Sequence, residues 1–286
     1  MLDPRWNTFL VLCETMNYTR AAQRLCLTQP AVTHHIHYLE QHYGKKLFSY
    51  EGKVLRLTDA GLRLRELTRS MAYNSRKIDG VMAADAPLSL RVGASKTIGE
   101  YVIAPRVEQF LRAHPEASFS LLVDNTQVLL QLLEEGTLDF VLVEGFFDRS
   151  RYDTRLYRKE AFFGVCPAGH RLAGRAVPLD ELAGERLLLR EPGSGTRAIF
   201  EDALRRQNLT LESFPGVVTL SDFAAIKSLV ADGLGISFLY APVVEKELAE
   251  GTLASFTLAD APMEGAFYFA CLKDNLFAHS WADWLE

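Results

Sequence analysis

The sequence predicts an α+β protein of several domains: an N-terminal winged helix-turn-helix, a long linker helix and a two-lobed α/β domain. Three observations predict this organisation. Two short helical patterns meet at a turn within residues 19–43, apolar residues then recur as a heptad over residues 60–81, and extended and helical patterns alternate beyond residue 87. A chain of 286 residues is long enough for two or three domains with cores of their own.

Charge is unevenly distributed along the chain, although the net value is only −5. Residues 1–86 carry a net charge of +4 and residues 87–286 one of −9. A mildly basic N-terminal part followed by an acidic remainder favours a DNA-binding module joined to a sensing domain. The mean hydropathy is near zero, no apolar run could span a bilayer, and the N-terminus lacks a signal-peptide pattern. We therefore expect a soluble, cytoplasmic protein.

The four cysteines, Cys13, Cys26, Cys166 and Cys271, are scattered without a C-x-x-C pair or metal-ligand spacing. Reduced thiols are the expected state, and the sequence predicts neither a metal nor a cofactor. A redox pair of Cys166 and Cys271 is the alternative, but no basic cluster that would activate either thiol lies nearby in sequence.

The first predicted helix covers Pro4–Met16, and Asn17-Tyr18-Thr19 breaks it and caps the next one. Ala21 and Ala22 are small enough to let two helices approach closely. Thr28-Gln29-Pro30 combines a capping hydroxyl with a proline, and both favour a helix start.

Helical spacing gives the second of these two helices two different faces. The apolar stripe consists of Val32, Ile36, Leu39 and Tyr43. The opposite face, which could enter a DNA major groove, carries Pro30, Thr33, His34, His37 and Gln41. On spacing alone, two amphipathic helices joined by a turn also occur in ordinary helical bundles.

A short wing is predicted after the second helix. Gly44 ends the second helix, and Lys45-Lys46 just past it are free to meet phosphate. Residues 47–57 read as two short strands, on which Lys53 and Arg56 are expected to contact the DNA backbone.

Thr58-Asp59 caps a helix that runs to about Ala84. Its heptad residues are Ala60, Leu64, Leu67, Met71, Asn74, Ile78 and Val81. This pattern predicts a dimeric coiled-coil seam in which one polar residue, Asn74, can fix the pairing. The alternative is a helix that packs on its own domain.

After a hinge at residues 85–87, strands and helices alternate as in a parallel α/β unit. In the first unit we predict strands at 88–93, 118–123 and 138–144 and helices at 98–114 and 127–135. A long extended segment at 154–166 leads to the second unit, with strands at 186–189, 216–219 and 236–239 and helices at 196–207 and 223–232. Residues 266–273 are predicted to be extended and 275–286 helical.

The residue identities in the first sixty positions are more specific than their spacing. The segments F-L-V-L-C-E-T-M-N-Y-T-R-A-A-Q-R-L-C-L-T-Q-P-A-V-T and L-R-L-T-D-A-G resemble the N-terminal domain of LysR-type transcriptional regulators. Length and the C-terminal half fit the same family. The resemblance implies domains at 1–58 (DNA binding), 59–86 (dimerising linker helix) and 87–286 (effector binding). The last is similar to periplasmic binding proteins, with lobe I at 87–162 and 267–286 and lobe II at 163–266.

The resemblance also implies function: a regulator that binds double-stranded promoter DNA as a homodimer or homotetramer and senses a small-molecule effector. The residues expected to contact DNA are Thr19, Gln29, Pro30, Ala31, Thr33, His34, His37, Lys53 and Arg56. Two positions depart from the family. Histidines 34, 35 and 37 stand where basic residues are common, and Tyr50 stands where arginine is common. Because imidazole gains a proton below about pH 6.5, we expect DNA affinity to rise as the pH falls from 8 to 6.

Two strand-to-helix turns are candidate effector contacts. Gly93–Gly99 and Glu191–Arg197 each offer hydroxyls, free backbone N–H groups and one basic side chain, and in two-lobed folds ligands bind between the lobes at strand ends. The expected contacts are Ser95, Lys96, Thr97, Asn125, Thr126, Glu144, Ser194, Gly195, Thr196 and Arg197. They predict a small anionic effector, a carboxylate or an inorganic oxyanion. The alternative is that both are ordinary capped turns. T-I-G-E-Y and E-P-G-S-G-T-R also resemble regulators of sulfur assimilation and carbon fixation.

Two other classes of protein are the alternatives to a regulator. A solute-binding protein could share the two-lobed fold, but the helix-turn-helix and the lack of a signal peptide argue against it. An enzyme is not expected, because the sequence contains no G-x-S-x-G, no P-loop and no zinc signature.

Overall fold

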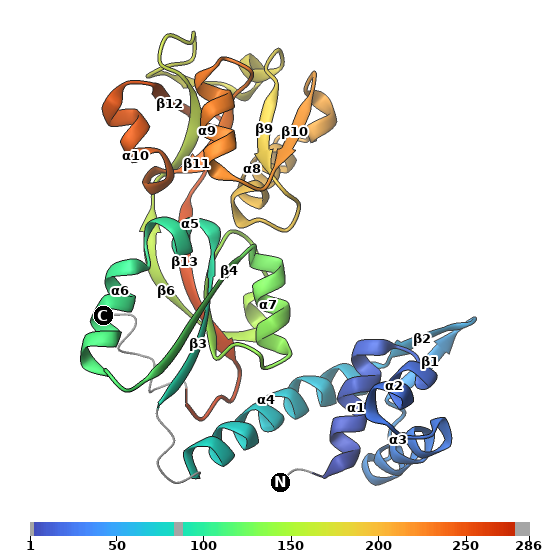
Figure 1. Cartoon of the computed structure of the whole chain (residues 1–286). Coiled ribbons are helices and arrows are strands. Elements are labelled where there is room, and N and C mark those ends of the chain that lie inside the picture. The colour runs from blue at the N-terminus through green and yellow to red at the C-terminus, as the bar shows by residue number, and fades with distance from the viewer. Residues whose placement is uncertain (1–2, 83–87, 278–286) are drawn as a thin grey trace. The chain divides into compact units, whose positions relative to one another are not determined.

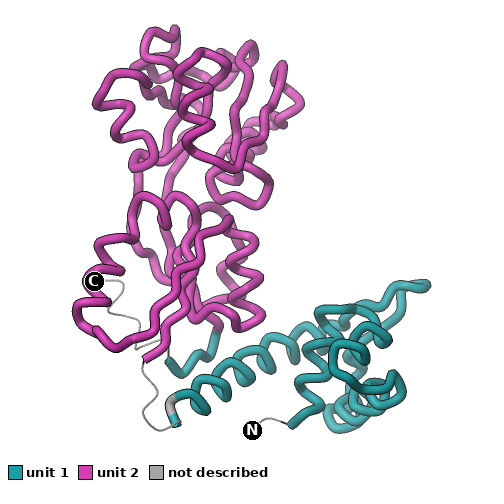
Figure 2. Tube along the Cα trace, in the orientation of Figure 1, with its two compact units in different colours: residues 1–86, 273–280 teal, residues 87–272, 281–286 magenta. Residues whose placement is uncertain are grey.

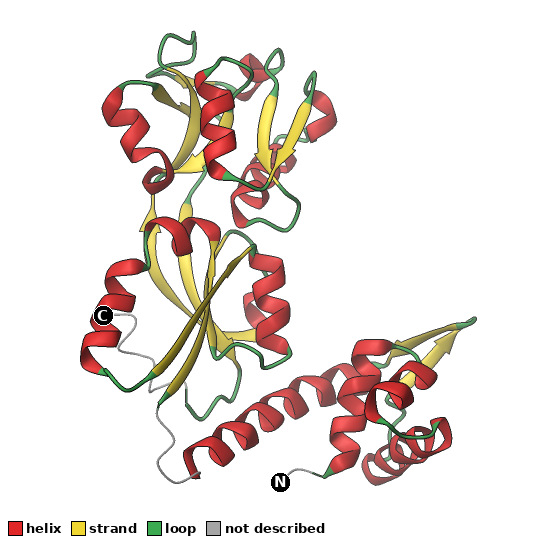
Figure 3. Ribbon diagram, in the orientation of Figure 1, coloured by secondary structure: helices red, strands yellow, loops and turns green. Residues whose placement is uncertain are grey.

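The computed structural model describes residues 3–82 and 88–277. The chain divides into two compact units (Figure 2), residues 1–86 with 273–280 and residues 87–272 with 281–286. Both units mix helices with strands (Figure 3). The predicted hinge at residues 85–87 lies outside the described residues. Within those residues, none of the helices has the length and apolar character needed to cross a membrane.

The first unit begins with a winged helix-turn-helix. Its elements are α1 (Pro4–Thr15), α2 (Tyr18–Leu25), α3 (Gln29–Tyr43), β1 (Phe48–Glu51) and β2 (Val54–Leu57), with the two strands antiparallel. Phe9, Leu12, Ala21, Val32 and Ile36 lie at the centre of its core. The predicted apolar stripe is wrong at its last residue. Tyr43 is 39% exposed, and Glu40 is buried instead.

The long helix α4 (Asp59–Met82) completes this unit. Ala60 and Leu64 pack against the core of the helix-turn-helix, whereas the heptad residues Leu67, Met71 and Ile78 are 50%, 44% and 45% exposed. Asn74 differs from the expectation. Its Nδ2 donates to the carbonyl of Asp274 at 2.8 Å, and its Oδ1 accepts from the N–H of Leu276 at 3.1 Å. The Asn74 amide is therefore engaged within its own chain.

The second unit contains a five-stranded sheet with helices on both faces, called lobe I (Figure 1). Its strands are β3 (Ser89–Ser95), β4 (Ser118–Asp124), β5 (Phe140–Glu144), β6 (Tyr152–Glu160) and β13 (Gly265–Leu272), in the order β4-β3-β5-β13-β6. Strands β3, β4 and β5 are parallel, so their carboxyl ends meet at one edge. Strand β13 lies between β5 and β6 and is antiparallel to both. Through β13 the chain returns from the second lobe to this sheet.

The helices of lobe I correct one prediction. Instead of one helix over 98–114 there are two, α5 (Lys96–Tyr101) and α6 (Ala104–Ala113), with Pro105 in the first turn of α6. Pro105 has no N–H to donate to the carbonyl of Tyr101 four residues earlier, and its ring crowds that carbonyl, so α5 ends at Tyr101 and a new helix begins with the proline in its first turn. Helix α7 (Thr126–Glu134) follows β4, and a short 3-10 turn, η1, spans Arg149–Arg151.

Lobe II holds the remaining elements of this unit. They are β7 (Phe162–Pro167), β8 (Ala176–Val177), η2 (Leu179–Leu182), β9 (Leu187–Arg190), α8 (Gly195–Arg206), η3 (Leu211–Ser213), β10 (Val217–Leu220), α9 (Phe223–Ala231), β11 (Ser237–Tyr240), α10 (Ala241–Glu250) and β12 (Leu253–Leu258). The strands form two sheets, β11-β7-β12-β8 and β10-β9. Strands β6 and β13 run between the lobes (Figure 1).

Three further expectations differ from the structure. The single extended segment expected at 154–166 is two strands that belong to different lobes, β6 and β7. Elements α10, β8 and β12 were not predicted. Of the helix expected at 275–286, Asn275–Phe277 instead form a turn, and the rest lies outside the described residues.

Candidate functional site

Helix α3 presents the predicted DNA-contact face. Its start is stabilised by Thr28, whose hydroxyl accepts from the N–H of Ala31 at 3.3 Å, and by Pro30 in the first turn. Of the predicted contacts, seven are exposed: Thr19, Gln29, Pro30, His34, His37, Lys53 and Arg56. Ala31 and Thr33 are half-buried, and the Thr33 hydroxyl donates to the carbonyl of Gln29 at 3.0 Å.

Several charged groups around this face are engaged with neighbours. Buried Glu40 accepts from Lys46 Nζ at 2.6 Å and from the Leu47 N–H at 3.0 Å, so Lys46 is not the free phosphate contact that was expected. His37 Nδ1 lies 3.8 Å from Glu40 Oε2, and Arg56 pairs with Glu51 on the wing. Glu40 therefore links α3 to Leu47, the residue just before the wing strand β1.

His35 packs against α1 and does not belong to the exposed face of α3. Its Nδ1 lies 2.9 Å from the hydroxyl of Thr8, a buried residue of α1. This contact joins α1 to α3. Only His34 and His37 of the three neighbouring histidines therefore remain on the exposed face.

A second group of polar residues lies where lobes I and II meet. The hydroxyl of Thr97, in α5 of lobe I, donates to Glu144 Oε1 at 3.0 Å, and the hydroxyl of Thr196, in α8 of lobe II, donates to the same oxygen at 3.2 Å. Thr126 Oγ1 donates to the Glu144 carbonyl at 3.0 Å. The two turns predicted from sequence thus converge on one carboxyl group, at the end of β5.

Glu144 is 1% exposed, and burial raises the pKa of its carboxyl to about 7. The hydroxyl of Thr97 and the positive charge of Arg190 act in the opposite direction and only partly offset the burial. Arg190, at the end of β9, is itself 2% exposed. It makes two hydrogen bonds to the neighbouring carboxylate of Glu191, and its guanidinium lies 4.5 Å from the centre of the Phe223 ring.

Three atoms of this region, Ser95 Oγ, Glu144 Oε2 and Arg190 Nη1, are buried yet make no hydrogen bond to any part of the chain that the structure describes. We call them the open polar atoms. A buried polar atom without a partner costs about 1–3 kcal/mol, and more for a charged group. Three such atoms close together at the junction of two lobes are compatible with a site whose partner is supplied from outside.

The other predicted effector contacts already have hydrogen-bond or ion-pair partners within the chain. Lys96 Nζ donates to the carbonyl of Ser221 at 2.6 Å and so links lobe I to lobe II. Arg197 pairs with Glu201 at 2.7 Å. Asn125 and Ser194 cap α7 and α8, accepting from the N–H groups of Val128 at 3.0 Å and Arg197 at 3.2 Å. The ordinary-cap alternative therefore describes Asn125 and Ser194 in this structure.

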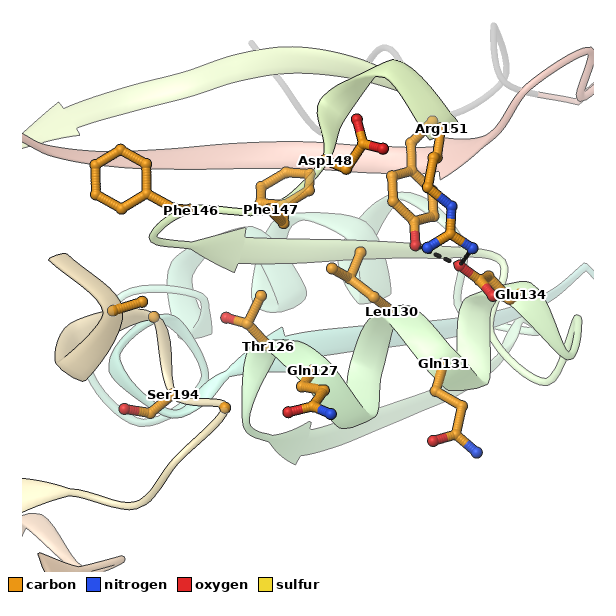
Figure 4. A pocket seen from close by; sticks show the side chains of 14 residues that line it. Thr126, Gln127, Leu130, Gln131, Glu134, Phe146, Phe147, Asp148, Arg151 and Ser194 are labelled. Atoms are coloured by element: carbon orange, nitrogen blue, oxygen red, sulfur yellow. Dashed lines mark hydrogen bonds and ion pairs between the residues drawn. The ribbon is translucent and has the colours of Figure 1, made fainter. Parts of the chain in front are cut away.

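A cavity of about 430 Å³ lies beside the Glu144 cluster. Figure 4 shows helix α7 along one side, Phe146 and Phe147 along the other, and Ser194 at one end. At the opposite end Arg151 pairs with Glu134, which also accepts from the Tyr152 hydroxyl at 2.7 Å. Thr126, Ser194 and Gly195 were predicted; Gln127, Gln131 and the aromatic pair were missed, because no sequence signal joins α7 to the loop after β5.

The backbones of the two lobes touch next to this cavity. A side chain on Gly195 would place its Cβ 2.3 Å from the Glu144 carbonyl, and one on Gly145 would lie 2.4 Å from the Gly195 Cα. The Gln127 N–H also donates to the carbonyl of Gly193 at 3.3 Å. Glycine at position 195 is therefore required for the close approach of α8 to β5.

No metal or redox site was identified in the described residues. No group of three or more potential ligands is found there. Cys166 and Cys271 are both buried and unpaired, and burial raises the pKa of these thiols to about 11 and about 12. High pKa values make thiols unreactive, which argues against the redox pair.

Comparisons with known proteins agree with this architecture. The family model described as bacterial regulatory helix-turn-helix protein, lysR family, matches residues 5–62, and that described as LysR substrate binding domain matches residues 86–286. The RuBisCO operon transcriptional regulator of Allochromatium vinosum is 30% identical over 257 residues, covering 88% of this chain and 83% of the relative. The transcriptional regulator CysL of Bacillus subtilis is 28% identical over 245 residues, covering 84% and 81%.

Solved structures share the fold. Full-length OxyR from Pseudomonas aeruginosa has a TM-score of 0.60 at 24% identity and covers all of this chain and 93% of that protein. The regulatory domain of Synechocystis CcmR, solved in complex with 2-PG, has a TM-score of 0.61 at 23% identity and covers 69% of this chain and 95% of that domain. The matched family is one of regulators rather than enzymes, and its N-terminal model is a DNA-binding domain, which a solute-binding protein lacks. The chain belongs to the LysR family of DNA-binding transcriptional regulators, with a helix-turn-helix domain and an effector-binding domain.

Proposed function

We propose that residues 1–58 of this regulator read promoter DNA through α3, that residues 59–86 pair two chains and that residues 87–286 bind a small anionic effector between the lobes. In α3, Gln29, Pro30, Ala31, Thr33, His34 and His37 face the major groove, with Thr19 beside them. Lys53 and Arg56 on the wing contact phosphate. The exposure of seven of these nine side chains supports this assignment.

The DNA-binding proposal is tested by fluorescence anisotropy with duplex DNA from upstream of the protein's own gene. We expect saturable, salt-dependent binding that is tighter than to random duplex, and that Thr33→Ala weakens. Equal binding to both duplexes would contradict the assignment of α3 as the reading helix.

Pairing of two chains is proposed along α4. Leu67, Met71 and Ile78 lie on one heptad stripe and are exposed, which supports burial against a second copy. Sedimentation should show a dimer, or a tetramer if the effector-binding units also pair. Ile78→Asp should shift the dimer toward monomer, whereas Asp79→Asn, exposed on the same helix, should not. An unchanged mass for Ile78→Asp would contradict pairing along this stripe.

The effector site is proposed at the Glu144 cluster, next to the cavity. The observation that carries this proposal is the set of open polar atoms at the lobe junction. Ser95, Thr97 and Thr196 offer hydroxyls there, and Thr126 and Gly195 connect the cluster to the cavity wall. In this proposal Lys96, Ser194 and Arg197 shape the two turns and Asn125 caps α7, so none of the four contacts the effector directly, in keeping with their partners in the chain.

Calorimetric titration tests the effector site with simple carboxylates, sulfate and 2-PG, the compound bound to the CcmR regulatory domain. We expect at least one to bind and Thr196→Val to weaken it, because valine keeps the shape of threonine but loses its hydroxyl. Binding that is unaffected by Thr196→Val, or no binding of any probe, would contradict this location.

A further inference from the structure

The position of Glu144 limits what the proposed effector site can bind. Two hydroxyls from the two turns, those of Thr97 and Thr196, donate to Oε1 of this carboxyl. An acidic group of the protein therefore already occupies the point where the two turns converge. A ligand that binds here meets a carboxyl oxygen and not only hydrogen-bond donors.

The open polar atoms differ in what they require. Oε2 of an ionised Glu144 can only accept a hydrogen bond, and Nη1 of Arg190 can only donate one. Ser95 Oγ can do either, and its hydroxyl acts as a weak donor that lowers the pKa of the Glu144 carboxyl, although its geometry falls short of a full hydrogen bond. A ligand that satisfies all three atoms must therefore bring both a donor and an acceptor.

We propose that Glu144 makes the effector site selective for a small acid that also carries a hydroxyl or an ammonium group, which donates to Glu144 while the acidic group faces Arg190. This inference rests on the proposed effector site. It narrows the prediction of an anion from sequence, because a fully ionised oxyanion such as sulfate has acceptors only. Sites that hydrogen-bond a ligand hydroxyl reject analogues without it, since the buried partner is then left unpaired.

Repulsion between a bound anion and the Glu144 carboxylate favours the same selectivity. An anion without a donor would lie beside the Glu144 carboxyl, and two buried negative charges disfavour each other unless one takes up a proton. The groups that influence this carboxyl are Thr97, Arg190, Thr196, Ser95 and Tyr240. Arg190 is the only cation among these five, and Glu191 already accepts two of its hydrogen bonds. A plain anion should therefore bind more weakly as the pH rises from 6 to 8.

The experiment uses three matched acids: propionate, lactate and alanine, which carry hydrogen, hydroxyl and ammonium at the same carbon. Their affinities for the full chain are measured by calorimetry at pH 8, together with sulfate. We expect lactate or alanine to bind at least about tenfold more tightly than propionate or sulfate. In Glu144→Gln, where the carboxylate is replaced by a neutral amide that can also donate, this preference should fall below about threefold.

Control variants separate selectivity from folding. Glu108→Gln removes an exposed carboxylate of α6 and should keep the preference of the parent chain. Thermal unfolding shows whether Glu144→Gln is folded before its affinities are compared. The proposal is overturned if the parent binds the three acids equally, if it binds neither lactate nor alanine at high millimolar concentration, or if Glu144→Gln retains the full preference.

The outcome also distinguishes this inference from the site on which it rests. If the acids bind equally and Thr196→Val weakens all of them, the effector site is supported and the role of Glu144 is refuted. If neither these acids nor the wider set of carboxylates, sulfate and 2-PG binds, the proposed site itself fails.

Discussion

Helix α3 and the Glu144 cluster contain polar side chains of similar kinds in opposite surroundings. On α3 most of the predicted contacts are exposed on one helix and separated by a few residues in sequence. In the cluster, Ser95, Thr97, Glu144 and Thr196 come from both lobes and are all buried. Water satisfies the exposed groups of α3 until DNA replaces it, whereas the open polar atoms of the cluster have no partner among the described residues.

The comparison indicates how each region should respond to change. Substitutions on α3 remove contacts with DNA and should leave folding nearly intact. Substitutions in the cluster alter buried contacts between the lobes, so they should change stability as well as ligand binding.

The largest effect should come from the charge of Glu144. Its pKa is raised from 4.5 to about 7, so the folded chain holds this proton more tightly than the unfolded chain. The resulting stabilisation is present in full below about pH 4.5 and is lost as the pH rises through about 7, a change on the order of 3 kcal/mol. Denaturant unfolding of the parent and Glu144→Gln at pH 5 and pH 8 measures it. The variant should gain stability relative to the parent at pH 8.

Glu108→Gln serves as the matched control, because it makes the same chemical change on the surface of α6. Its stability should follow that of the parent at both pH values. Parallel profiles for the parent and Glu144→Gln would show that this carboxyl is not destabilised by burial.

The next largest effect is expected where the lobes touch. In Gly195→Ala the new Cβ would lie 2.3 Å from the Glu144 carbonyl and 2.5 Å from its Cγ, so α8 or β5 must shift. Overpacking of this kind costs about 1–3 kcal/mol. We expect a lower thermal midpoint and weaker effector binding, measured by calorimetry. Gly169→Ala, whose Cβ would meet nothing within 4 Å, is the control. An unchanged midpoint in Gly195→Ala would contradict the close approach.

A change on α3 should alter DNA binding without altering stability. Gln29→Ala removes an exposed amide at the start of the helix, and a specific base contact contributes about 1–3 kcal/mol. Anisotropy should show about a tenfold or greater loss of affinity for the promoter duplex, with little change for random duplex. Gln109→Ala, exposed on α6, is the matched control. A comparable loss in both variants, or a large fall in thermal midpoint, would remove the contrast between the two regions.

The smallest effect is expected from the histidines of α3. His34 and His37 are exposed, and a positive charge on this face would strengthen its attraction to phosphate. His37 faces Glu40, which Lys46 also contacts, so the increase should be only a few-fold between pH 8 and pH 6. It should disappear in a chain that carries His34→Gln and His37→Gln but persist in His114→Gln. Affinity that is independent of pH in the parent would refute the prediction.

Local sequence determined the helix-turn-helix almost completely. A capping threonine, a proline in the first turn and apolar residues at helical spacing are signals that act within one or two turns, so Thr28, Pro30, Val32 and Ile36 all lie where their types predict. The same signals placed most strands and helices of the effector-binding unit. These signals failed at the break between α5 and α6. A proline lies there, but the continuous apolar pattern over 98–114 favoured a single helix.

The composition of the interlobe site was decided only by tertiary structure. Both turns were recognisable as hydroxyl-rich, yet nothing local shows that Thr97 and Thr196 share one oxygen of Glu144, or that Arg190 is buried beside them. Likewise Lys96 and Arg197, which sequence analysis assigned to an anion, are engaged by Ser221 and Glu201. The physical reason is the distance along the chain over which each kind of signal acts. Caps and periodicity act between near neighbours in the chain, whereas the partner of a buried polar group depends on which strand ends the fold brings together.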